Sequence, residues 1–251
     1  MKKILQNIVI LSSILLGDNI LSEVQKEGVT IIDKYGKKVT IDRKQNPICN
    51  RSIQATALFS GDYAGESVLD ICKRSFVTQV GVLQPMSLSN GIKTVGELEL
   101  LTHIKKAQED SEAYILIDAR REEWFKQMTI PTAVNLPFDE IEYEEDKSED
   151  DFDEDEGDDY VEYQEHYKKM FKMLNIKKTK NGLDFSKAKS LLLFCNGSWC
   201  SQSPQAIYKL INIGYPKEKL LWYRGGLQDW LIYDFPVESG IEKNNQKMVK
   251  N

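Results

Sequence analysis

Two cysteines in the C-terminal third of the chain are the residues best suited to chemistry. Cys195 directly follows the apolar run 191–194, and Cys200 lies five residues later, shortly before Ser203 and Pro204. A serine followed by proline is typical of a helix start, with serine as N-cap and proline at the first helical position. A cysteine between a strand end and a helix start faces backbone N–H groups and the positive end of a helix dipole, which favour the thiolate. We therefore expect a reactive Cys195 thiolate; the alternatives are an inert buried cysteine or a structural disulfide with Cys200.

The elements that would position these cysteines alternate between strand and helix. Strands are predicted at residues 114–118, 133–136, 191–194 and 220–223, because these runs are short and apolar. Helices are predicted after the capping-box pair Thr94 and Glu97, around 122–127, along the apolar face 163–174, and over 203–213, which Gly214 would end. This alternation predicts an α/β fold with a parallel central sheet flanked by helices. Such sheets bind ligands beyond the carboxyl ends of their strands.

The N-terminal part predicts export and an extension ahead of this fold. Residues 1–22 have a positive start, an apolar stretch at 8–16 and small or polar residues after it. This is the layout of a signal peptide and too short to span a bilayer, although an uncleaved membrane tether is the alternative. We expect a protein of the bacterial periplasm. Residues 23–91 are interpreted as an extension with a β-hairpin at 29–42, in which Cys49 and Cys72 would form a structural disulfide. Residues 92–238 would form the main domain, and 239–251 a polar tail.

Charge is distributed unevenly along the 251 residues. The formal net charge is −6, yet residues 139–165 hold seventeen acidic residues and one lysine. The basic residues are scattered, which argues against nucleic-acid binding, and two histidines exclude most histidine-based metal sites. We expect the acidic segment to be a solvated, disordered loop, with docking to a basic partner as an alternative. A weaker alternative is calcium binding, since five carboxylates have the spacing of a calcium loop, with a misplaced glycine: Asp151, Asp153, Asp155, Asp159 and Glu162.

Four motifs between residues 92 and 237 resemble, in order, those of the rhodanese domain, a sulfurtransferase fold. The first is the strand end with Asp118 and Arg120, and the second is the segment TIPTAVNLP at 129–137. The third is the loop from Cys195 to Ser201, and the fourth is YRGG at 223–226 with Trp230 and a closing Pro-Val pair. More narrowly, CNGSWC at 195–200 with QPM at 84–86 resembles a group of exported single-domain rhodanese-like proteins.

The resemblance implies a mechanism and a set of site residues. Cys195 would take sulfur from thiosulfate or a related donor as a persulfide and pass it to a thiol or to a cyanide-like acceptor. Arg120 and Arg224 would bind substrate together with the loop residues Asn196, Gly197, Ser198, Trp199 and Ser201, and Asp118 would be structural. Trp199 is equally well a loop lid or a packed aromatic. No cofactor is implied, and the partners are small sulfur compounds and a redox partner protein, with no membrane contact beyond the signal peptide.

Two departures from the family pattern leave alternatives open. Many rhodaneses carry a basic residue where this chain has Cys200, and no basic residue lies between Lys189 and Lys209. We therefore expect Arg224 to supply a cation from across the pocket. Cys200 is a candidate resolving thiol, which would expel sulfide and leave a Cys195–Cys200 disulfide. A thiol–disulfide redox protein and a non-catalytic binding module are the competing functions. Related phosphatases need an arginine at the position of Ser201, so the phosphatase function is excluded.

Overall fold

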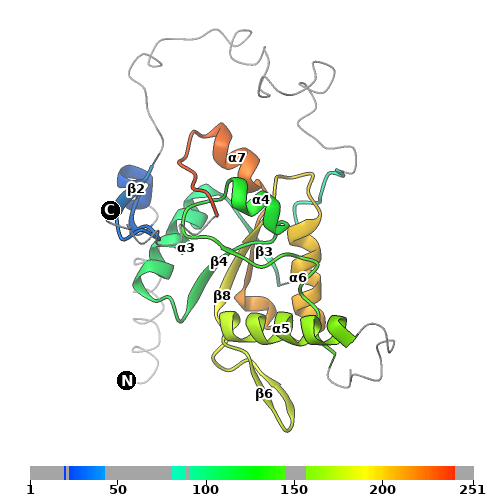
Figure 1. The fold of residues 1–251 in the computed structure, drawn as a ribbon. Helices are drawn as coiled ribbons and strands as arrows, with labels where there is room; N and C mark the ends of the chain where they lie inside the picture. The colour runs from blue at the N-terminus through cyan, green and yellow to red at the C-terminus, as the bar shows by residue number, and fades with distance from the viewer. Residues whose placement is uncertain (1–19, 21–22, 43–80, 89–90, 145–156, 241–251) are drawn as a thin grey trace, which may run out of the picture.

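A five-stranded parallel sheet forms the centre of the molecule (Figure 1). The computed structural model describes residues 20, 23–42, 81–88, 91–144 and 157–240. The strands are β3 (Lys93–Val95), β4 (Tyr114–Asp118), β5 (Val134–Asn135), β8 (Ser190–Phe194) and β9 (Leu220–Tyr223), in the spatial order β3-β9-β8-β4-β5. Every neighbouring pair is parallel, so the predicted fold class is confirmed.

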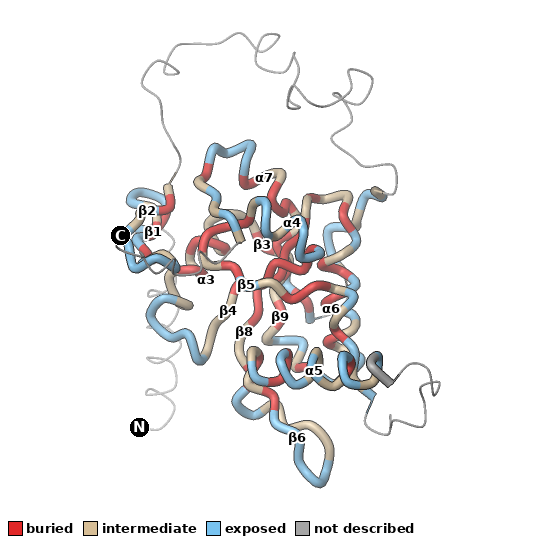
Figure 2. The backbone as a smooth tube through the Cα atoms, in the orientation of Figure 1, coloured by how far each residue is buried: buried red, intermediate tan, exposed pale blue. Residues whose placement is uncertain are grey.

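Helices cover both faces of the sheet because alternate strand residues point to opposite sides. Leu191 and Leu193 of β8 pack in one core with α5 (Gly157–Leu174) and α6 (Gln202–Asn212). Leu192 and Phe194 pack in the other with α3 (Glu97–Glu109) and α7 (Gly226–Ile232). The short helix α4 (Glu122–Gln127) has no buried residue. Figure 2 shows the strands of the sheet as the buried centre between these layers. Residues 195–201 therefore leave the central strand of the sheet and lead directly into a helix.

The predicted N-terminal hairpin is present. Strands β1 (Val29–Ile32) and β2 (Lys38–Ile41) pair antiparallel around a turn at residues 33–37. Val29, Ile31 and Ile41 are buried in the core cluster that includes α3. The hairpin is thus packed onto the same face of the sheet as α3.

Two helix starts differ from their predictions. Helix α3 follows Gly96, whose N–H donates to the Glu99 carboxylate at 3.1 Å, whereas Thr94 belongs to β3. Helix α6 has Ser201 as its N-cap, so Ser203 is the second helical residue and Pro204 the third. Proline is still tolerated there, because the N–H groups of a first helical turn have no intrahelical acceptor. A second antiparallel hairpin, β6 (Lys177–Thr179) with β7 (Gly182–Asp184), was not predicted.

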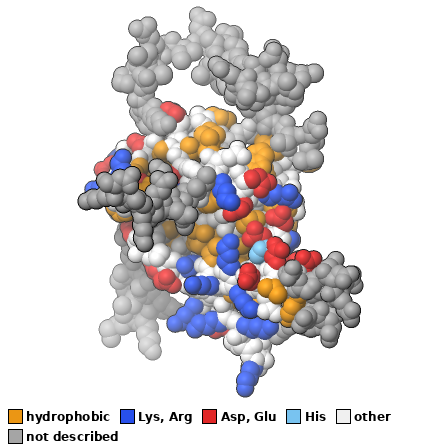
Figure 3. All heavy atoms as spheres, in the orientation of Figure 1, with side chains coloured by type: hydrophobic (Ala, Val, Ile, Leu, Met, Phe, Trp, Pro, Cys, Tyr) orange, Lys and Arg blue, Asp and Glu red, His pale blue; other side chains and the backbone are white. Residues whose placement is uncertain are grey.

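The expectation of a disordered loop over all of 139–165 is wrong for its last third. Residues 157–165 belong to α5, whose apolar face packs Tyr163, Met170 and Phe171 against the core as the spacing predicts. Ile141 is also buried. In Figure 3, acidic side chains lie beside the histidine near the middle of the face, and basic ones gather lower down. Helix formation here follows from the buried aromatic face, and the acidic residues of the first two turns lie at the positive end of the helix dipole, where negative charge is favourable.

Several predictions fall on residues outside the described ranges. These are the signal peptide at 1–22 apart from Ile20, the Cys49–Cys72 disulfide, the carboxylates of Asp151, Asp153 and Asp155, and the tail beyond residue 240. Among the helices in the described ranges, none combines the length and the apolar character that a membrane crossing requires.

Candidate active site

Cys195 lies at the carboxyl end of β8, where the chain turns through residues 195–201, here called the Cys195 loop, into α6. The residue is 2% exposed. The loop closes on itself through a hydrogen bond from the Cys200 N–H to the Gly197 carbonyl at 3.0 Å. The sequence prediction for the position of Cys195 is therefore confirmed.

Ser203 is the hydrogen-bond donor to the sulfur of Cys195. Its hydroxyl lies 3.1 Å from Cys195 Sγ, and the thiol in turn reaches the Cys200 carbonyl at 3.4 Å. Burial raises the pKa of Cys195 well above its usual range, with contact with the Cys200 thiol acting in the same direction and Ser203 acting against it. Removal from water thus opposes the predicted Cys195 thiolate more strongly than the donors of the loop favour it, and the reactivity of Cys195 stays a prediction.

Cys200 is the more acidic thiol of the two. Hydrogen bonding with the Cys195 thiol lowers the pKa of Cys200 to about 7, against burial, and the backbone N–H groups of Asn196 and Gln202 and the charge of Arg120 also favour its thiolate. Both cysteines are free thiols in the structure. Two thiolates in contact would repel each other, so ionisation of one thiol disfavours ionisation of the other, and Cys200 is the thiol that ionises first.

A buried ion pair supports the first residue of the loop. Arg120 is 2% exposed and binds the fully buried Asp118 carboxylate, with 2.7 Å between Nη2 and Oδ2. Thr129 donates its hydroxyl to the same carboxylate at 2.8 Å. Another guanidinium nitrogen of Arg120 donates to the Asn196 side-chain oxygen at 3.2 Å, and the Asn196 amide approaches Cys200 Sγ at 4.0 Å. Asp118 has the structural surroundings predicted for it, whereas the predicted substrate-binding role of Arg120 stays a prediction, since this buried side chain is bound to Asp118 and Asn196.

The start of α7 packs against the backbone of the Cys195 loop. The N–H groups of Leu227 and Gln228 donate to the carbonyls of Cys195 and Asn196, both at 2.9 Å. Gly226 has a φ of +59°, and a Cβ at this position would lie 2.4 Å from the Cys195 carbonyl oxygen. Only glycine permits this approach, which explains physically why the sequence has a glycine pair after β9.

Residues 81–88, here called the strap, cross the outer side of the loop. The N–H groups of Val82 and Gln84 donate to the carbonyls of Trp199 and Ser198, at 3.0 and 2.8 Å. The indole N–H of Trp199 donates to the Gln228 side chain at 2.8 Å, so Trp199 is a packed, half-buried aromatic held at its polar edge. Together these bonds fix the outer half of the loop.

Arg224 is bound to the strap. Its guanidinium donates to the Gln84 carbonyl at 2.8 Å and to the Pro85 carbonyl at 3.2 Å. The expectation that Arg224 supplies a cation to the pocket receives no support from these contacts, because the side chain is engaged by backbone oxygens. Arg120 is the arginine whose charge reaches the cysteine pair.

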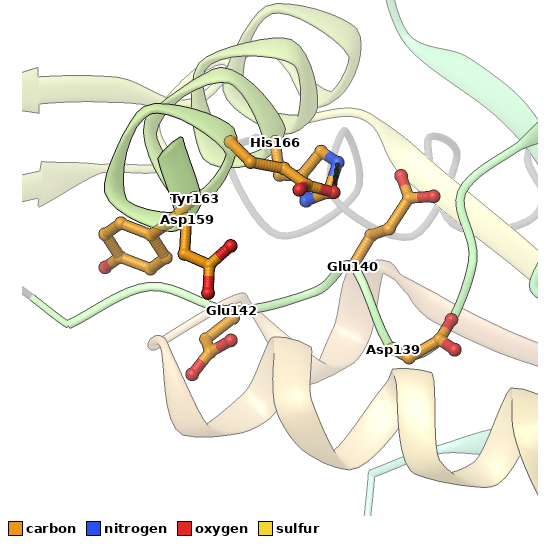
Figure 4. A pocket seen from close by; sticks show the side chains of 7 residues that line it. Asp139, Glu140, Glu142, Asp159, Tyr163 and His166 are labelled. Atoms are coloured by element: carbon orange, nitrogen blue, oxygen red, sulfur yellow. Dashed lines mark ion pairs between the residues drawn. The ribbon is translucent and has the colours of Figure 1, made fainter. Parts of the chain in front are cut away.

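A separate pocket of about 230 Å³ lies between α5 and the segment after β5 (Figure 4). Carboxylates and one histidine line it, and Glu162 pairs with His166 at 3.6 Å. Asp159 and Glu162, two of the five calcium candidates, belong to this lining. Within the described ranges, no three histidine, cysteine or acidic side chains are arranged to hold a metal ion.

The structure gathers most of the predicted site residues and adds two that sequence reasoning missed. The residues brought together are Cys195, Asn196, Gly197, Ser198, Trp199, Cys200, Ser201, Asp118 and Arg120. The Ser201 hydroxyl accepts from the Gln205 side chain on the exposed side of α6. The sequence pattern indicates Ser203 only as a helix cap and Trp222 only as a strand residue, yet Trp222 donates its indole N–H to Ser203 at 3.0 Å. No local pattern reveals this contact, since its partners are nineteen residues apart.

The family model for the rhodanese-like domain matches residues 99–232, and the chain belongs to this family. The match begins in α3 and ends with α7, so it covers the sheet from β4 onward and the whole Cys195 loop. No curated protein matches the chain.

Solved structures with a similar fold come from bacteria and from human. The human single-domain sulfurtransferase TSTD1 is 23% identical, with 55% of this chain and 95% of that chain covered and a TM-score of 0.33. A rhodanese with anions from E. coli is 19% identical, with 50% and 96% covered and a TM-score of 0.29. The BH2092 protein from Bacillus halodurans is 21% identical, with 59% and 77% covered and a TM-score of 0.37.

Proposed function

We propose that the protein is a sulfurtransferase in which Cys195 carries the transferred sulfur. The Cys195 thiolate attacks the outer sulfur of thiosulfate or a related sulfane donor, a new S–S bond forms, and the donor's S–S bond breaks with sulfite as the leaving group. The attack of an acceptor thiolate on the outer sulfur then breaks the bond to Cys195 and restores its thiolate. The balance needs no external oxidant or reductant.

The observation that carries this proposal is the placement of Cys195. It ends a buried parallel strand, lies in a closed loop of backbone amides at the start of α6, and receives a hydrogen bond from Ser203. Such donors stabilise a sulfur anion in a site that excludes water. Membership of the rhodanese-like family supports the same chemistry at this position.

Cys200 gives the cysteine pair a second chemical option. Its thiolate is next to Cys195, and its attack on the inner sulfur of a Cys195 persulfide would form the Cys195–Cys200 disulfide and release hydrosulfide. A dithiol reductant, which we propose to be a redox partner protein in the exported compartment, would then have to restore both thiols. The contact between the thiols and the pKa of about 7 for Cys200 also favour thiol–disulfide exchange as the second candidate function.

Peptide mass spectrometry of the reduced protein exposed to thiosulfate tests the proposal. We expect the mass of one sulfur atom to be added to Cys195 and lost on addition of cyanide. Cys195→Ser should abolish the addition, and Cys200→Ser should prolong the life of the persulfide. A Cys195–Cys200 disulfide that forms in wild type with oxidants, while no sulfane donor adds sulfur to the Cys200→Ser variant, would refute sulfur transfer and favour the exchange function.

A further inference from the structure

A buried chain of hydrogen bonds leads from β9 to the sulfur of Cys195. Trp222 lies in β9 and Ser203 in the first turn of α6, and both residues are 0% exposed. The indole N–H of Trp222 lies 3.0 Å from Ser203 Oγ, which in turn lies 3.1 Å from Cys195 Sγ. The three groups come from three elements that meet at the carboxyl edge of the sheet.

The chemistry of the three groups determines which of them donates and which accepts in each hydrogen bond. An indole N–H only donates, so the oxygen of Ser203 must act as the acceptor toward Trp222. A hydroxyl has one hydrogen, and the remaining side-chain partner of this oxygen is Cys195 Sγ. In a helix, a serine hydroxyl commonly turns back to a carbonyl of the preceding turn instead. The indole thus holds the hydroxyl in the orientation that donates to sulfur.

The two thiols of the loop have different hydrogen-bond partners. Cys200 lies near the Asn196 amide and the charge of Arg120 and donates to the Gln202 side-chain oxygen at 3.8 Å, whereas in the described part of the chain the side chain that donates to Cys195 Sγ is that of Ser203. Since a charge on one sulfur disfavours ionisation of the other, the donors to each sulfur help to decide which thiol ionises more readily.

We propose that Ser203, oriented by Trp222, is a catalytic residue whose hydroxyl stabilises the Cys195 thiolate when it attacks the sulfur donor and when it leaves the transferred sulfur. This inference rests on the proposed sulfur transfer for its second step. In the first step, the hydroxyl stabilises the attacking Cys195 thiolate. In the second, the bond between Cys195 and the outer sulfur breaks, its electron pair returns to Cys195 Sγ, and the same hydroxyl stabilises this leaving thiolate.

The size of the effect follows from the loss of one hydrogen bond to a charged group. Such bonds correspond to roughly a tenfold change in thiolate population at fixed pH. A less stabilised thiolate is also more nucleophilic, with a Brønsted coefficient of about 0.4–0.5, so the rate at which Cys195 is alkylated should fall by about threefold. The release of sulfur from a Cys195 persulfide should slow by a similar factor, because the leaving thiolate is less stable.

The test measures the iodoacetamide alkylation of Cys195 against pH in the full chain, by mass spectrometry with fragmentation that separates Cys195 from Cys200. Ser203→Ala removes the donor, and Trp222→Phe keeps a ring but removes the N–H that orients it. Thr102→Ala is the control, because the Thr102 hydroxyl lies outside the Cys195 loop and donates to the Leu98 carbonyl of its own helix α3 at 2.8 Å. Each variant is also prepared with Cys200→Ser, so that one thiol of the pair remains.

We expect Ser203→Ala and Trp222→Phe to move the alkylation midpoint of Cys195 to higher pH by about one unit, and Thr102→Ala to leave it in place. In the Ser203→Ala protein, Trp222→Phe should cause no further shift. An unchanged midpoint in either Ser203→Ala or Trp222→Phe, with an unchanged circular dichroism spectrum, overturns the inference. Alkylation needs no sulfur donor, so a wild type that forms no persulfide would refute the proposed function while the midpoints still decide the role of Ser203 on Cys195.

Discussion

Gly226 offers the sharpest test of how α7 shapes the Cys195 loop. Its φ of +59° is costly for alanine, and a Cβ would lie 2.4 Å from the Cys195 carbonyl oxygen and 2.6 Å from the Gly197 nitrogen. These are backbone atoms of the loop, so no side-chain rotation relieves the contact. Gly36 is the matched control, because its φ is +77° and a Cβ there meets nothing within 4 Å.

The difference between the two alanine variants isolates the contact with the loop. The left-handed conformation alone costs about 1–2 kcal/mol, which is what we expect Gly36→Ala to lose. Gly226→Ala should lose a further ~2 kcal/mol, because the loop must move and weaken the hydrogen bonds from Leu227 and Gln228 at about 1 kcal/mol each. Urea unfolding followed by circular dichroism gives both free energies. Equal losses in the two variants would refute the close packing of α7 on the loop.

Three further predictions concern charge in the interior. The pKa of Cys200 is about 7, and burial raises the pKa of Cys195. In the reduced wild type, the alkylation of Cys200 should therefore rise through pH 7, while Cys195 reacts only at higher pH. A peptide-resolved pH series that finds the opposite order would contradict this. Arg120→Met should destabilise the fold by about 3–5 kcal/mol in urea unfolding, since Asp118 would be left buried and unpaired, and a loss below about 1 kcal/mol would argue against the buried pair. Burial lowers the pKa of His103 from 6.5 to about 4, so the stability contributed by the neutral imidazole is complete above pH 6.5 and is lost as pH falls toward 4. Between pH 7 and pH 4, the free energy of unfolding of wild type should fall by about 3 kcal/mol more than that of His103→Gln. Parallel losses in the two proteins would count against the shift.

The strands and the position of Cys195 could be predicted because each depends on short stretches of sequence. The runs at 114–118 and 191–194 are apolar for the whole length of a buried parallel strand, and Cys195 follows the second of them directly. The hairpin at 29–42 could be predicted equally well, since its turn separates two alternating segments. The strand β3, three residues long, carries too little signal to be recognised.

The helix starts were harder to predict, since the residues that could cap them have stronger partners elsewhere. Ser203 has the right residue type for an N-cap, but its hydroxyl is drawn to Cys195 by the indole of Trp222, and the helix begins at Gln202 instead. Thr94 similarly fits a capping box, yet it is paired in β3 with Trp222 of β9. In both cases a tertiary contact outweighs a local preference.

The role of the arginines could not be decided from their distance along the chain. Arg224 is the arginine closest in sequence to the loop, but the carbonyls of Gln84 and Pro85, some 140 residues earlier, engage its guanidinium. Arg120 precedes the loop by more than 70 residues and yet donates to the Asn196 side chain. The strands before these arginines, β4 and β9, both flank β8, so the contacts of Arg224 with residues 84 and 85, and not the sheet order, decide which arginine reaches the loop.

The protonation of the cysteine pair is the clearest case in which local reasoning fails. From the amides of the loop and the start of α6, the sequence predicts a thiolate at Cys195, whereas the structure lowers the pKa of Cys200 and raises that of Cys195. Two sulfurs share those donors, and a charge on one sulfur disfavours ionisation of the other. Which sulfur ionises more readily depends in part on the difference between Arg120 with Asn196 on one side and Ser203 with Trp222 on the other. Because burial raises the pKa of Cys195 well above its usual range, the hydrogen bond from Ser203 is the contact that offsets part of this cost when Cys195 must ionise.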